Sequence, residues 1–494
     1  MRITIRGLMI FAGLLFGFIL IFQLFNLTTT SLWHDEAFSA LLIQYEDYGE
    51  MIRRIGLDVH PPLYYILLRF WTGIFNTSLF SLRAFSLLFG IGTALGIFFL
   101  TKEIFRNSTL AFLSAVLLSL VSFQVQYNLE ARMYTLGAFF LVFATFFVLH
   151  ALKTRVPSTS FFMFMAAYVT CASAALYTHY YTVFGIFAHG LFILYALRFR
   201  LKQLALFAGA FLAIALLFLP WLPTFLRQLS QVQTSYWIPP ITKWSIATTI
   251  SKMTIGDGLD PNQAAFLIIL VNILALGAFF FMLSRYSQKE RWILLFLFLA
   301  PFLGSLLLSL KTSIYLDRYF IFYLPYLIIA LAAAIFAIPQ KQTRFILLTF
   351  ILIGAVLSYP LHAWTWRLSE KPGMEGATSY LLPSLQKEDE ILINSSFVYF
   401  TFLYYNESDV HPLLYAPDEL PHFSGTALLN RQDITRSFDI AEAGDTIWTI
   451  DTTGFGNFQP TVPVSWQKQE EKEFPDAYNH RGSIIVRKYL VQDK

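Results

Sequence analysis

The sequence predicts an α-helical polytopic membrane protein with about eleven transmembrane helices and a small C-terminal α/β domain on the outer side. Two observations support this fold class. Hydrophobic residues make up 56% of the 494 residues and charged residues only 13%, against roughly a quarter in soluble domains. Acidic and basic residues return beyond Trp364. We therefore expect a membrane domain over residues 1–364 and a soluble extracytoplasmic domain over residues 365–494.

Apolar segments of about 17–25 residues are long enough to cross the hydrocarbon core as helices. The predicted spans lie near residues 7–27, 81–101, 109–124, 131–152, 161–176, 181–197, 204–222, 264–283, 292–310, 319–338 and 345–362. The first span follows Arg2 and Arg6 and has no small-residue cleavage motif after it. We therefore expect a retained span and not a removed signal peptide.

When successive spans cross the membrane in alternating directions, basic and acidic residues fall on opposite sides of it. With a cytoplasmic N-terminus, the inner segments carry Arg2, Arg6, Lys102, Arg106, Lys153, Arg155, Arg198, Arg200, Lys202, Arg285, Lys289, Arg291, Lys341 and Arg344. Their acidic residues are Glu103 and Glu290, and the other acids before the tail fall on the outer side. An excess of Lys and Arg marks cytoplasmic loops. The sequence thus predicts a multi-pass protein of the cytoplasmic (inner) membrane with its C-terminal domain outside.

Two long outer loops separate the spans. In residues 28–80, apolar side chains at helical spacing over 38–55 predict one amphipathic interfacial helix, and Pro61-Pro62 predicts the start of a second helix. Residues 223–262 contain turn-forming residues and are predicted as a flap over a site. In the tail, the expected strands are 391–393, 446–450 and 483–486, and the expected helices are 376–385 and 397–405.

The motif Trp33-His34-Asp35-Glu36 follows the first span directly. Ionisable groups at a membrane face are functional candidates by default. The same outer side also holds Asp58, His60, Tyr64, Glu130, Arg132, Tyr134, His179, Tyr180 and Arg318. Carboxylates, imidazoles, tyrosines and arginines at one rim of a helical bundle suit the binding of an anionic lipid-linked substrate and proton abstraction from an acceptor.

Each candidate also has a structural explanation that the sequence leaves open. Asp35 and Glu36 fit the first turn of a helix, where acids are favourable on their own, and Asp58 fits a cap or turn before the two prolines. Arg132 fits a local ion pair with Glu130 at the end of a span.

Two further candidates have comparable alternatives. His179 lies among aromatic residues, where an interfacial histidine is often fully hydrogen bonded. Arg318 is placed where it could contact only lipid head groups.

The acidic motif after the first span, the sequence D-x-HPPLYY in the same loop, EARMY before the fourth span and the outer soluble domain resemble the GT-C superfamily of membrane glycosyltransferases. Within it, the chain is most similar to bacterial relatives of the protein O-mannosyltransferases and of the aminoarabinose transferases. The resemblance covers residues 1–364. It implies transfer of a monosaccharide from a polyprenyl-phosphate-linked donor to a lipid, glycan or protein acceptor at the outer face, with inversion.

The resemblance also implies roles for single residues. Asp35 would be the catalytic base, Glu36 its neighbour and stand-in, and Glu130 the second acidic position. The expected substrate-binding residues are Asp58, His60, Tyr64, Arg132, Tyr134, His179, Tyr180 and Arg318. Independently of the resemblance, a departing lipid phosphate gains negative charge, which guanidinium groups stabilise, so Arg132 and Arg318 are the phosphate candidates.

A divalent metal ion stays an open alternative, with Glu130, His60 and His179 as its candidate ligands. We expect membrane lipids as further partners and no nucleic acid. A secondary transporter is the main competing function, although transporters tend to place ionisable groups near the midplane and in repeated halves. A membrane-anchored adhesion or sensory protein would not require so many spans. The single cysteine, Cys171, excludes a disulfide framework.

Overall fold

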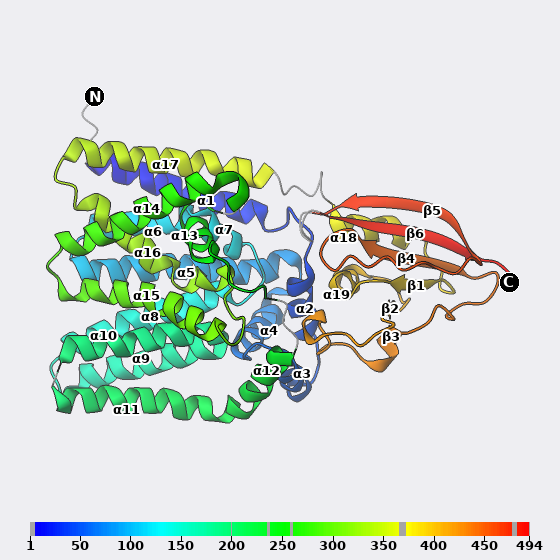
Figure 1. The fold of residues 1–494 in the computed structure, drawn as a ribbon, viewed down its shortest axis with the longest axis horizontal. Helices are drawn as coiled ribbons and strands as arrows, with labels where there is room; N and C mark the ends of the chain where they lie inside the picture. Colours follow the sequence, from blue (N-terminus) through cyan, green and yellow to red (C-terminus); the bar gives the residue numbers. More distant parts are fainter. Residues whose placement is uncertain are drawn as a thin grey trace. The chain divides into compact units, whose positions relative to one another are not determined.

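A computed structural model of the chain describes residues 5–198, 200–234, 238–256, 260–364, 372–476 and 482–493 (Figure 1). It divides into two compact units. The first comprises Met1–Leu24, His60–Tyr64 and Arg83–Tyr359, and the second comprises Phe25–Val59, Tyr65–Leu82 and Pro360–Lys494. Most of the first outer loop therefore groups with the C-terminal part of the chain, although some 280 residues separate them in the sequence.

The first unit is a bundle of α-helices (Figure 1). Its helices are α1 (Ile5–Asn26), α5 (Leu79–Phe105), α6 (Ser108–Leu120), α7 (Ser122–Asn128), α8 (Tyr134–Lys153), α9 (Thr159–Thr178), α10 (Val183–Leu197), α11 (Leu201–Phe218), α12 (Leu222–Thr234), α13 (Ser245–Ile255), α14 (Pro261–Arg285), α15 (Trp292–Ser309), α16 (Leu324–Phe336) and α17 (Lys341–Trp364). The last residues of α1, the first of α5 and the last of α17 belong to the second unit.

The lengths of these helices confirm a multi-pass membrane protein. Within the described residues, seven helices are long and apolar enough to cross a membrane. The predicted span 109–124 is broken, because α6 and α7 meet at an angle of 68°. The predicted spans 7–27 and 319–338 correspond to shorter apolar helices, Ile10–Asn26 and α16. The number of spans, eleven, stays a prediction.

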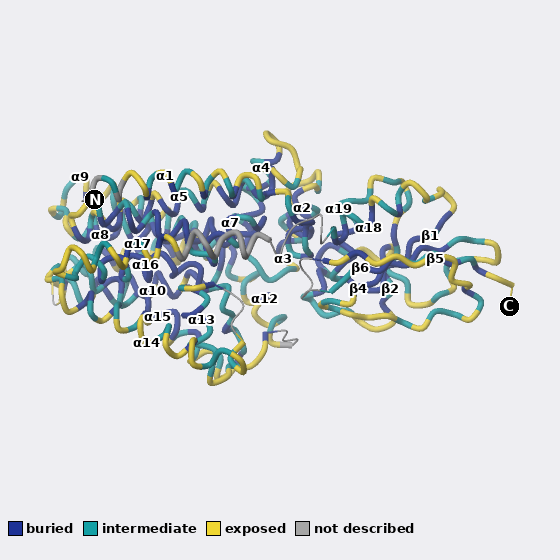
Figure 2. The backbone as a smooth tube through the Cα atoms, turned by 90° about the horizontal axis from the view of Figure 1, so that it is seen from above, coloured by how far each residue is buried: buried dark blue, intermediate teal, exposed yellow. Residues whose placement is uncertain are grey.

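Burial differs between inner and outer helices of the bundle. Residues of α8 and α16 are mostly buried, whereas much of α14 is exposed (Figure 2). Helices α11 and α14 keep many exposed apolar side chains, as expected for helices that face lipid. Gly137, near the start of α8, lets Phe322 approach closely, since a Cβ there would lie 2.6 Å from Cε1 of Phe322. This contact brings the start of α8 against the short 3-10 helix Asp317–Phe322.

The segment predicted as the flap, 223–262, is mostly helical. It forms α12 and α13. Of the turn residues predicted at 236–240 and 256–258, positions 236, 237, 257 and 258 lie outside the described residues. The side chain of Asn272 on α14 donates to the backbone oxygen of Ala247 at 2.8 Å and to Oγ of Ser251 at 3.1 Å. Tyr315 Oη donates to Thr249 Oγ1 at 2.8 Å. These bonds fix α13 against two other elements of the first unit.

The second unit contains α2 (His34–Leu42), α3 (Tyr48–Leu57) and most of α4 (Leu63–Phe75). The prediction of one helix over 38–55 is wrong. The helix ends at Leu42 and restarts at Tyr48, because the Asp47 carboxylate accepts the backbone N–H of Glu50 at 2.7 Å and caps a new helix. The helix predicted after Pro61-Pro62 is confirmed as α4.

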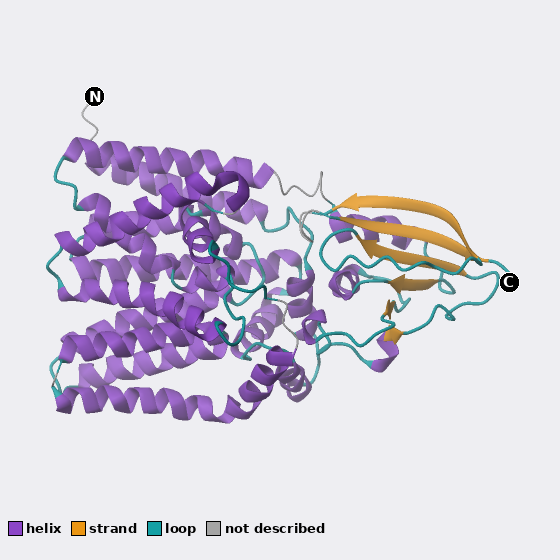
Figure 3. Ribbon diagram, viewed as in Figure 1, coloured by secondary structure: helices purple, strands orange, loops and turns teal. Residues whose placement is uncertain are grey.

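The C-terminal part of the second unit is built on a six-stranded mixed sheet (Figure 3). The strands are β1 (Glu390–Ile393), β2 (Leu413–Tyr415), β3 (Ile434–Thr435), β4 (Thr446–Thr452), β5 (Trp466–Pro475) and β6 (Ser483–Val491), in the order β3-β2-β1-β4-β6-β5. Strands β1 to β4 pair in parallel, with Leu392 opposite Thr449, and β5 and β6 pair antiparallel. The predicted α/β character is confirmed.

Both faces of this sheet are covered. Helix α18 (Gly373–Leu381) packs on β5 and β6, and α19 (Ser396–Tyr405) packs on β1. Leu392, Ile447 and Trp466, from strands β1, β4 and β5, form an apolar cluster on the sheet. The three predicted strands and two predicted helices are found, whereas β2, β3 and β5 were missed.

Candidate active site

His179 lies at the centre of the polar residues that the first unit brings together. It follows α9 and precedes the short 3-10 helix Tyr180–Thr182, and only 6% of its surface is exposed. Its ring centroid lies 5.9 Å from that of His60 and 6.1 Å from that of Tyr134. The rings of Tyr319 and Phe322 lie nearer, at 4.7 and 4.9 Å. Residues from four separate parts of the sequence therefore meet at this imidazole.

The protonation of His179 follows from its surroundings. Burial lowers the pKa of His179 well below its usual value, and the neighbouring His60 and Arg132 lower it further. Its Nδ1 accepts the backbone N–H of Tyr181 at 3.1 Å. The neutral imidazole therefore carries its proton on Nε2. This Nε2 is buried and has no hydrogen-bond partner within the described residues.

A chain of hydrogen bonds holds the His60 backbone and Tyr180 together. Trp221 Nε1 donates to the Tyr180 hydroxyl at 2.7 Å, and this hydroxyl donates to Gln228 Oε1 at 2.5 Å. Gln228 Nε2 donates in turn to the backbone oxygen of His60 at 3.3 Å. Gln228 belongs to α12, so the segment predicted as a flap supplies a side chain to this network. No sequence motif singles out Gln228.

Glu130, Arg132 and Tyr134 lie between α7 and α8 and at the start of α8. All three are at most 5% exposed. The backbone N–H of Arg132 donates to the backbone oxygen of Glu130 at 2.8 Å, which tightens this turn. Ser86 Oγ on α5 donates to the backbone oxygen of Arg132 at 3.3 Å. Thr135 Oγ1 donates in turn to the backbone oxygen of Ser86 at 2.8 Å. The guanidinium and the carboxylate are thus buried on a fixed backbone, where charges act strongly.

Arg318 lies in the 3-10 helix Asp317–Phe322. Its backbone N–H donates to Oδ1 of Asp317 at 2.8 Å, and Oδ2 of Asp317 forms an ion pair with Lys252 of α13. The adjacent Tyr319 is the residue whose ring contacts His179. The Tyr127 hydroxyl lies within electrostatic range of both Arg318 and Glu130. Arg318 therefore belongs to the same region as the EARMY residues.

Two cations in this region were not predicted as site residues. Lys252 positions Asp317, as described above. Arg83, at the start of the part of α5 in the first unit, is completely buried. It precedes Ser86 by three residues and so shares a helix face with the residue that bonds Arg132. A fully buried arginine requires anionic or polar partners, and its position at the end of an apolar span was the signal available in the sequence.

Tyr64 is completely buried, with its ring centroid 5.9 Å from that of Phe85 on α5. The structure thus places it in the first unit beside α5.

Asp35 and Glu36 belong to the second unit and have different environments there. Glu36 is completely buried, and its Oε2 accepts the backbone N–H of the N-cap residue Trp33 at 3.4 Å at the start of α2. Asp35 is half-buried, and its backbone oxygen accepts from Ser39 Oγ at 2.9 Å. Glu36 therefore has the structural role, at the first turn of a helix, that the sequence left open for both acids.

Helix α2 is held by α19 of the C-terminal domain. The ring of His34 lies 5.0 Å from Phe397 and 5.6 Å from Phe400. The backbone N–H of Leu32 donates to the Tyr405 hydroxyl at 2.8 Å. The domain at the C-terminus thus fixes the helix that carries Asp35.

Asp58 is the C-terminal cap of α3, and it ends that helix instead of beginning the next one. Its backbone N–H donates to the oxygens of Arg54 and Ile55 at 3.3 and 3.1 Å. The guanidinium of Arg54 donates to the Ala427 oxygen at 3.0 Å, which anchors α3 on the C-terminal domain. Burial lowers the pKa of the nearby His422, and the charge of Asp58 partly offsets this effect.

The metal alternative has no matching cluster in the structure. Within the described ranges, no three His, Cys, Asp or Glu side chains converge so as to hold a metal ion. Glu130, His60 and His179 stay a prediction as metal ligands. The cation Arg132 beside His179 also opposes a second positive charge at this place.

Comparison with known proteins supports the predicted resemblance. Residues 59–223 match the family described as dolichyl-phosphate-mannose-protein mannosyltransferase. No curated protein matches the chain.

Solved structures match over nearly the whole chain. ArnT from Cupriavidus metallidurans in the apo state is 12% identical and has a TM-score of 0.61, with 96% of this chain and 97% of that chain covered. The structure of ArnT bound to undecaprenyl phosphate gives 11% identity and a TM-score of 0.61, with 97% and 98% covered. The oligosaccharyltransferase of Archaeoglobus fulgidus in the apo form is 15% identical over 81% of this chain and 63% of that chain, with a TM-score of 0.47.

The match to ArnT extends through the C-terminal domain, and the family match covers the loop and helices that carry His60, Arg132 and His179. The chain is therefore a multi-pass membrane protein with the fold of ArnT.

Proposed function

We propose that the chain is a glycosyltransferase that moves one monosaccharide from a polyprenyl-phosphate-linked donor to a lipid, glycan or protein acceptor at the outer face of the cytoplasmic membrane. The observation that carries this proposal is the buried Nε2–H of His179 beside Arg132. A neutral donor next to a guanidinium suits a phosphate oxygen that gains charge as the sugar departs. The fold of ArnT, which binds undecaprenyl phosphate in one solved structure, supports the same class of ligand.

In the proposed reaction, the acceptor hydroxyl gives its proton to the Asp35 carboxylate. Its oxygen forms the new bond to the anomeric carbon, while the bond from that carbon to the phosphate oxygen breaks. The electron pair of the broken bond stays on the lipid phosphate. Because the displacement is single, the anomeric configuration inverts.

Arg132 and Arg318 would stabilise the leaving phosphate by charge, and His179 would donate one hydrogen bond to it. Glu130 would act as the second acidic group, and Asp58, His60, Tyr64, Tyr134 and Tyr180 would complete substrate binding. Glu36 would support Asp35 by capping α2. The C-terminal domain would keep α2 in place through α19, which is consistent with the contacts of His34 and Leu32.

The test uses isolated membranes that contain the full chain and a radiolabelled polyprenyl-phosphate sugar. The proposal predicts transfer of label to an endogenous acceptor, with an anomeric configuration in the product opposite to that in the donor. Retention of configuration would contradict the single displacement. Solute uptake by proteoliposomes without any transfer would instead favour the transporter.

A further inference from the structure

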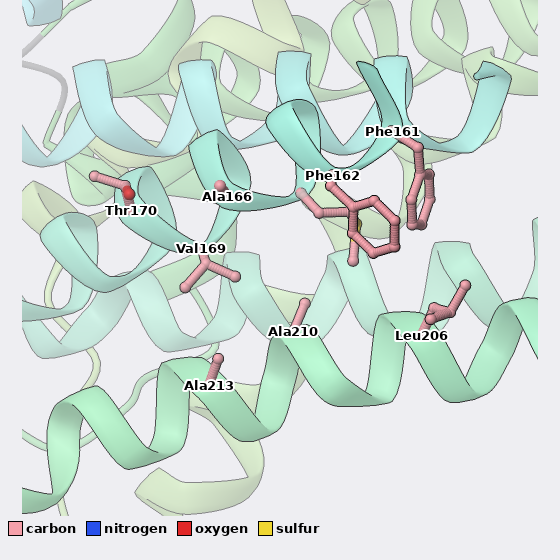
Figure 4. Close-up of a pocket in the computed structure, with 9 residues that line it drawn as sticks. Phe161, Phe162, Ala166, Val169, Thr170, Leu206, Ala210 and Ala213 are labelled. Atoms are coloured by element: carbon pink, nitrogen blue, oxygen red, sulfur yellow. The ribbon is translucent and has the colours of Figure 1, made fainter. Parts of the chain in front are cut away.

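An apolar cavity of about 400 Å³ lies between α9 and α11 (Figure 4). Its lining includes Phe162, Ala166 and Val169 from α9 and Leu206, Ala210 and Ala213 from α11. The alanines leave the space open, because their side chains reach little beyond the backbone. Neighbouring side chains such as Phe162 and Leu212 are more than half exposed, so this side of the bundle faces lipid.

The cavity has the length of one lipid leaflet. The lining of α9 runs from Phe161 to Thr170, ten residues whose nine helical steps rise about 14 Å. Half of the hydrocarbon core measures about 15 Å. A second apolar depression shares Phe162 and Ala166 and continues to Pro157 at the beginning of α9. The groove thus starts at one end of the bundle and ends near the middle of a span.

Cations flank the end at which the groove starts. Arg155 lies in the connection from α8 to α9, and Lys202 lies one helical turn before Leu206 on α11. Both side chains are exposed, and within the described residues neither forms an ion pair. Lys153 differs, because it is paired with Glu103 at 2.8 Å. An apolar groove of leaflet length with two unpaired cations at one end matches an anionic phospholipid, whose acyl chain fits the groove and whose phosphate fits the cations.

We propose that this groove binds an anionic membrane phospholipid, with one acyl chain between α9 and α11 and the phosphate at Arg155 and Lys202. By the distribution of Lys and Arg, this end of the bundle is the cytoplasmic one, so the lipid belongs to the inner leaflet. The site lies at the opposite end of α9 from His179. It is therefore independent of the proposed transfer reaction.

Native mass spectrometry of the full chain, with phosphatidylglycerol or phosphatidylcholine of the same acyl chains, tests this site. Ala210→Trp fills the groove and is expected to lower phosphatidylglycerol retention more than tenfold, on the order of 1.4 kcal/mol. Leu212→Trp places the same ring on the lipid-facing side of α11 and is expected to leave retention unchanged. Thermal unfolding of both variants reports whether the bundle stays intact.

The variant Arg155→Gln/Lys202→Gln changes only exposed residues and tests the head-group contact separately. It is expected to lower the preference for phosphatidylglycerol over phosphatidylcholine by roughly fivefold for each cation removed. Equal retention by the wild type of both lipids, or unchanged retention by Ala210→Trp, would overturn the proposal. Displacement of phosphatidylglycerol by equimolar undecaprenyl phosphate would also overturn it and assign the groove to a polyprenyl chain.

Discussion

The Nδ1 atom of His179 accepts the backbone N–H of Tyr181 at 3.1 Å, which leaves the imidazole proton on a buried Nε2. One backbone hydrogen bond therefore decides which nitrogen can donate to a substrate. It also makes His179 a neutral donor beside the cation Arg132, because the pKa of His179 is lowered by burial and by its neighbours. A phosphate at this place would receive charge from Arg132 and a directed hydrogen bond from His179.

The first prediction concerns this donor. His179→Ala removes it and is expected to lower the transfer rate by about 10²-fold, the usual effect of losing one donor to a developing oxyanion. His179→Gln places an amide N–H near the position of Nε2 and is expected to retain more activity than His179→Ala. Steady-state kinetics of both variants with a labelled lipid donor provide the measurement. Equal losses in both variants would indicate that packing of the ring matters and not the donor.

A second prediction follows from the lowered pKa of His179. The folded protein keeps His179 neutral, whereas the unfolded chain binds a proton near pH 6.5. The stability that depends on the neutral form is thus fully present above about pH 6.5 and is lost as the pH falls below it, by at most about 1.4 kcal/mol per pH unit. Thermal unfolding at about pH 7.5 and pH 5 is expected to show a smaller acid destabilisation in His179→Gln than in the wild type. An identical pH dependence in both proteins would contradict the neutral assignment.

A third prediction concerns the ion pair between Lys252 and Asp317. Lys252→Gln frees the Asp317 carboxylate that accepts the Arg318 backbone N–H, and so loosens the helix that carries Arg318. Because both side chains are more than a quarter exposed, the expected effect is modest, a rise in donor KM of about two- to fivefold with kcat little changed. Lys243→Gln changes an exposed lysine of the same segment and serves as the control. A loss confined to kcat would assign Lys252 a different role.

A fourth prediction concerns Phe400, which is 1% exposed and lies 5.6 Å from His34 and 6.2 Å from Phe38 between ring centroids. Phe400→Ala removes two aromatic contacts of α19 with α2 and is expected to cost about 3–5 kcal/mol of stability. Transfer is expected to fall as well, because α2 carries Asp35. Phe458→Ala, at a residue that is 42% exposed, should change neither quantity much. Full activity in a destabilised Phe400→Ala protein would show that α19 does not position Asp35.

Seven of the predicted membrane spans correspond to helices long and apolar enough to cross a bilayer, because length and hydropathy are what such a prediction uses. His179 was placed correctly between α9 and α10 for this reason. The bend between α6 and α7 was missed because the apolar pattern continues through Val121 without a proline or glycine.

Other elements depend on information that hydropathy does not carry. Asp47 caps α3 and interrupts a continuous amphipathic pattern, although an acid followed three residues later by Glu50 is itself a helix-start signal. The strand β5 was missed because its residues 467–473 are all exposed and charged or amidic, so no alternation marks it. Such charged side chains are common on edge strands, where they prevent pairing with other chains.

The composition of the site was partly predictable, but its geometry was not. His60, Arg132 and His179 share one region because three separate parts of the chain pack there, which no local pattern indicates. The contributions of Gln228 and Lys252 come from helices within a segment that resembled a loop. Asp35 and Glu36 differ because the carboxylate of Glu36 reaches the backbone N–H of Trp33. Which of the two adjacent acids does so depends on where the helix begins, and the sequence does not show this.

The central claim is that Asp35 takes the proton of the acceptor, and the transfer rates of Asp35→Asn and Glu36→Gln test it most directly. Both substitutions replace a carboxylate by an amide of the same shape, and the amide oxygen of Gln at position 36 can still accept the Trp33 backbone N–H. The account predicts that Asp35→Asn lowers the rate by about 10²–10⁴-fold at unchanged stability, whereas Glu36→Gln retains most activity. A fully active Asp35→Asn protein would contradict the account.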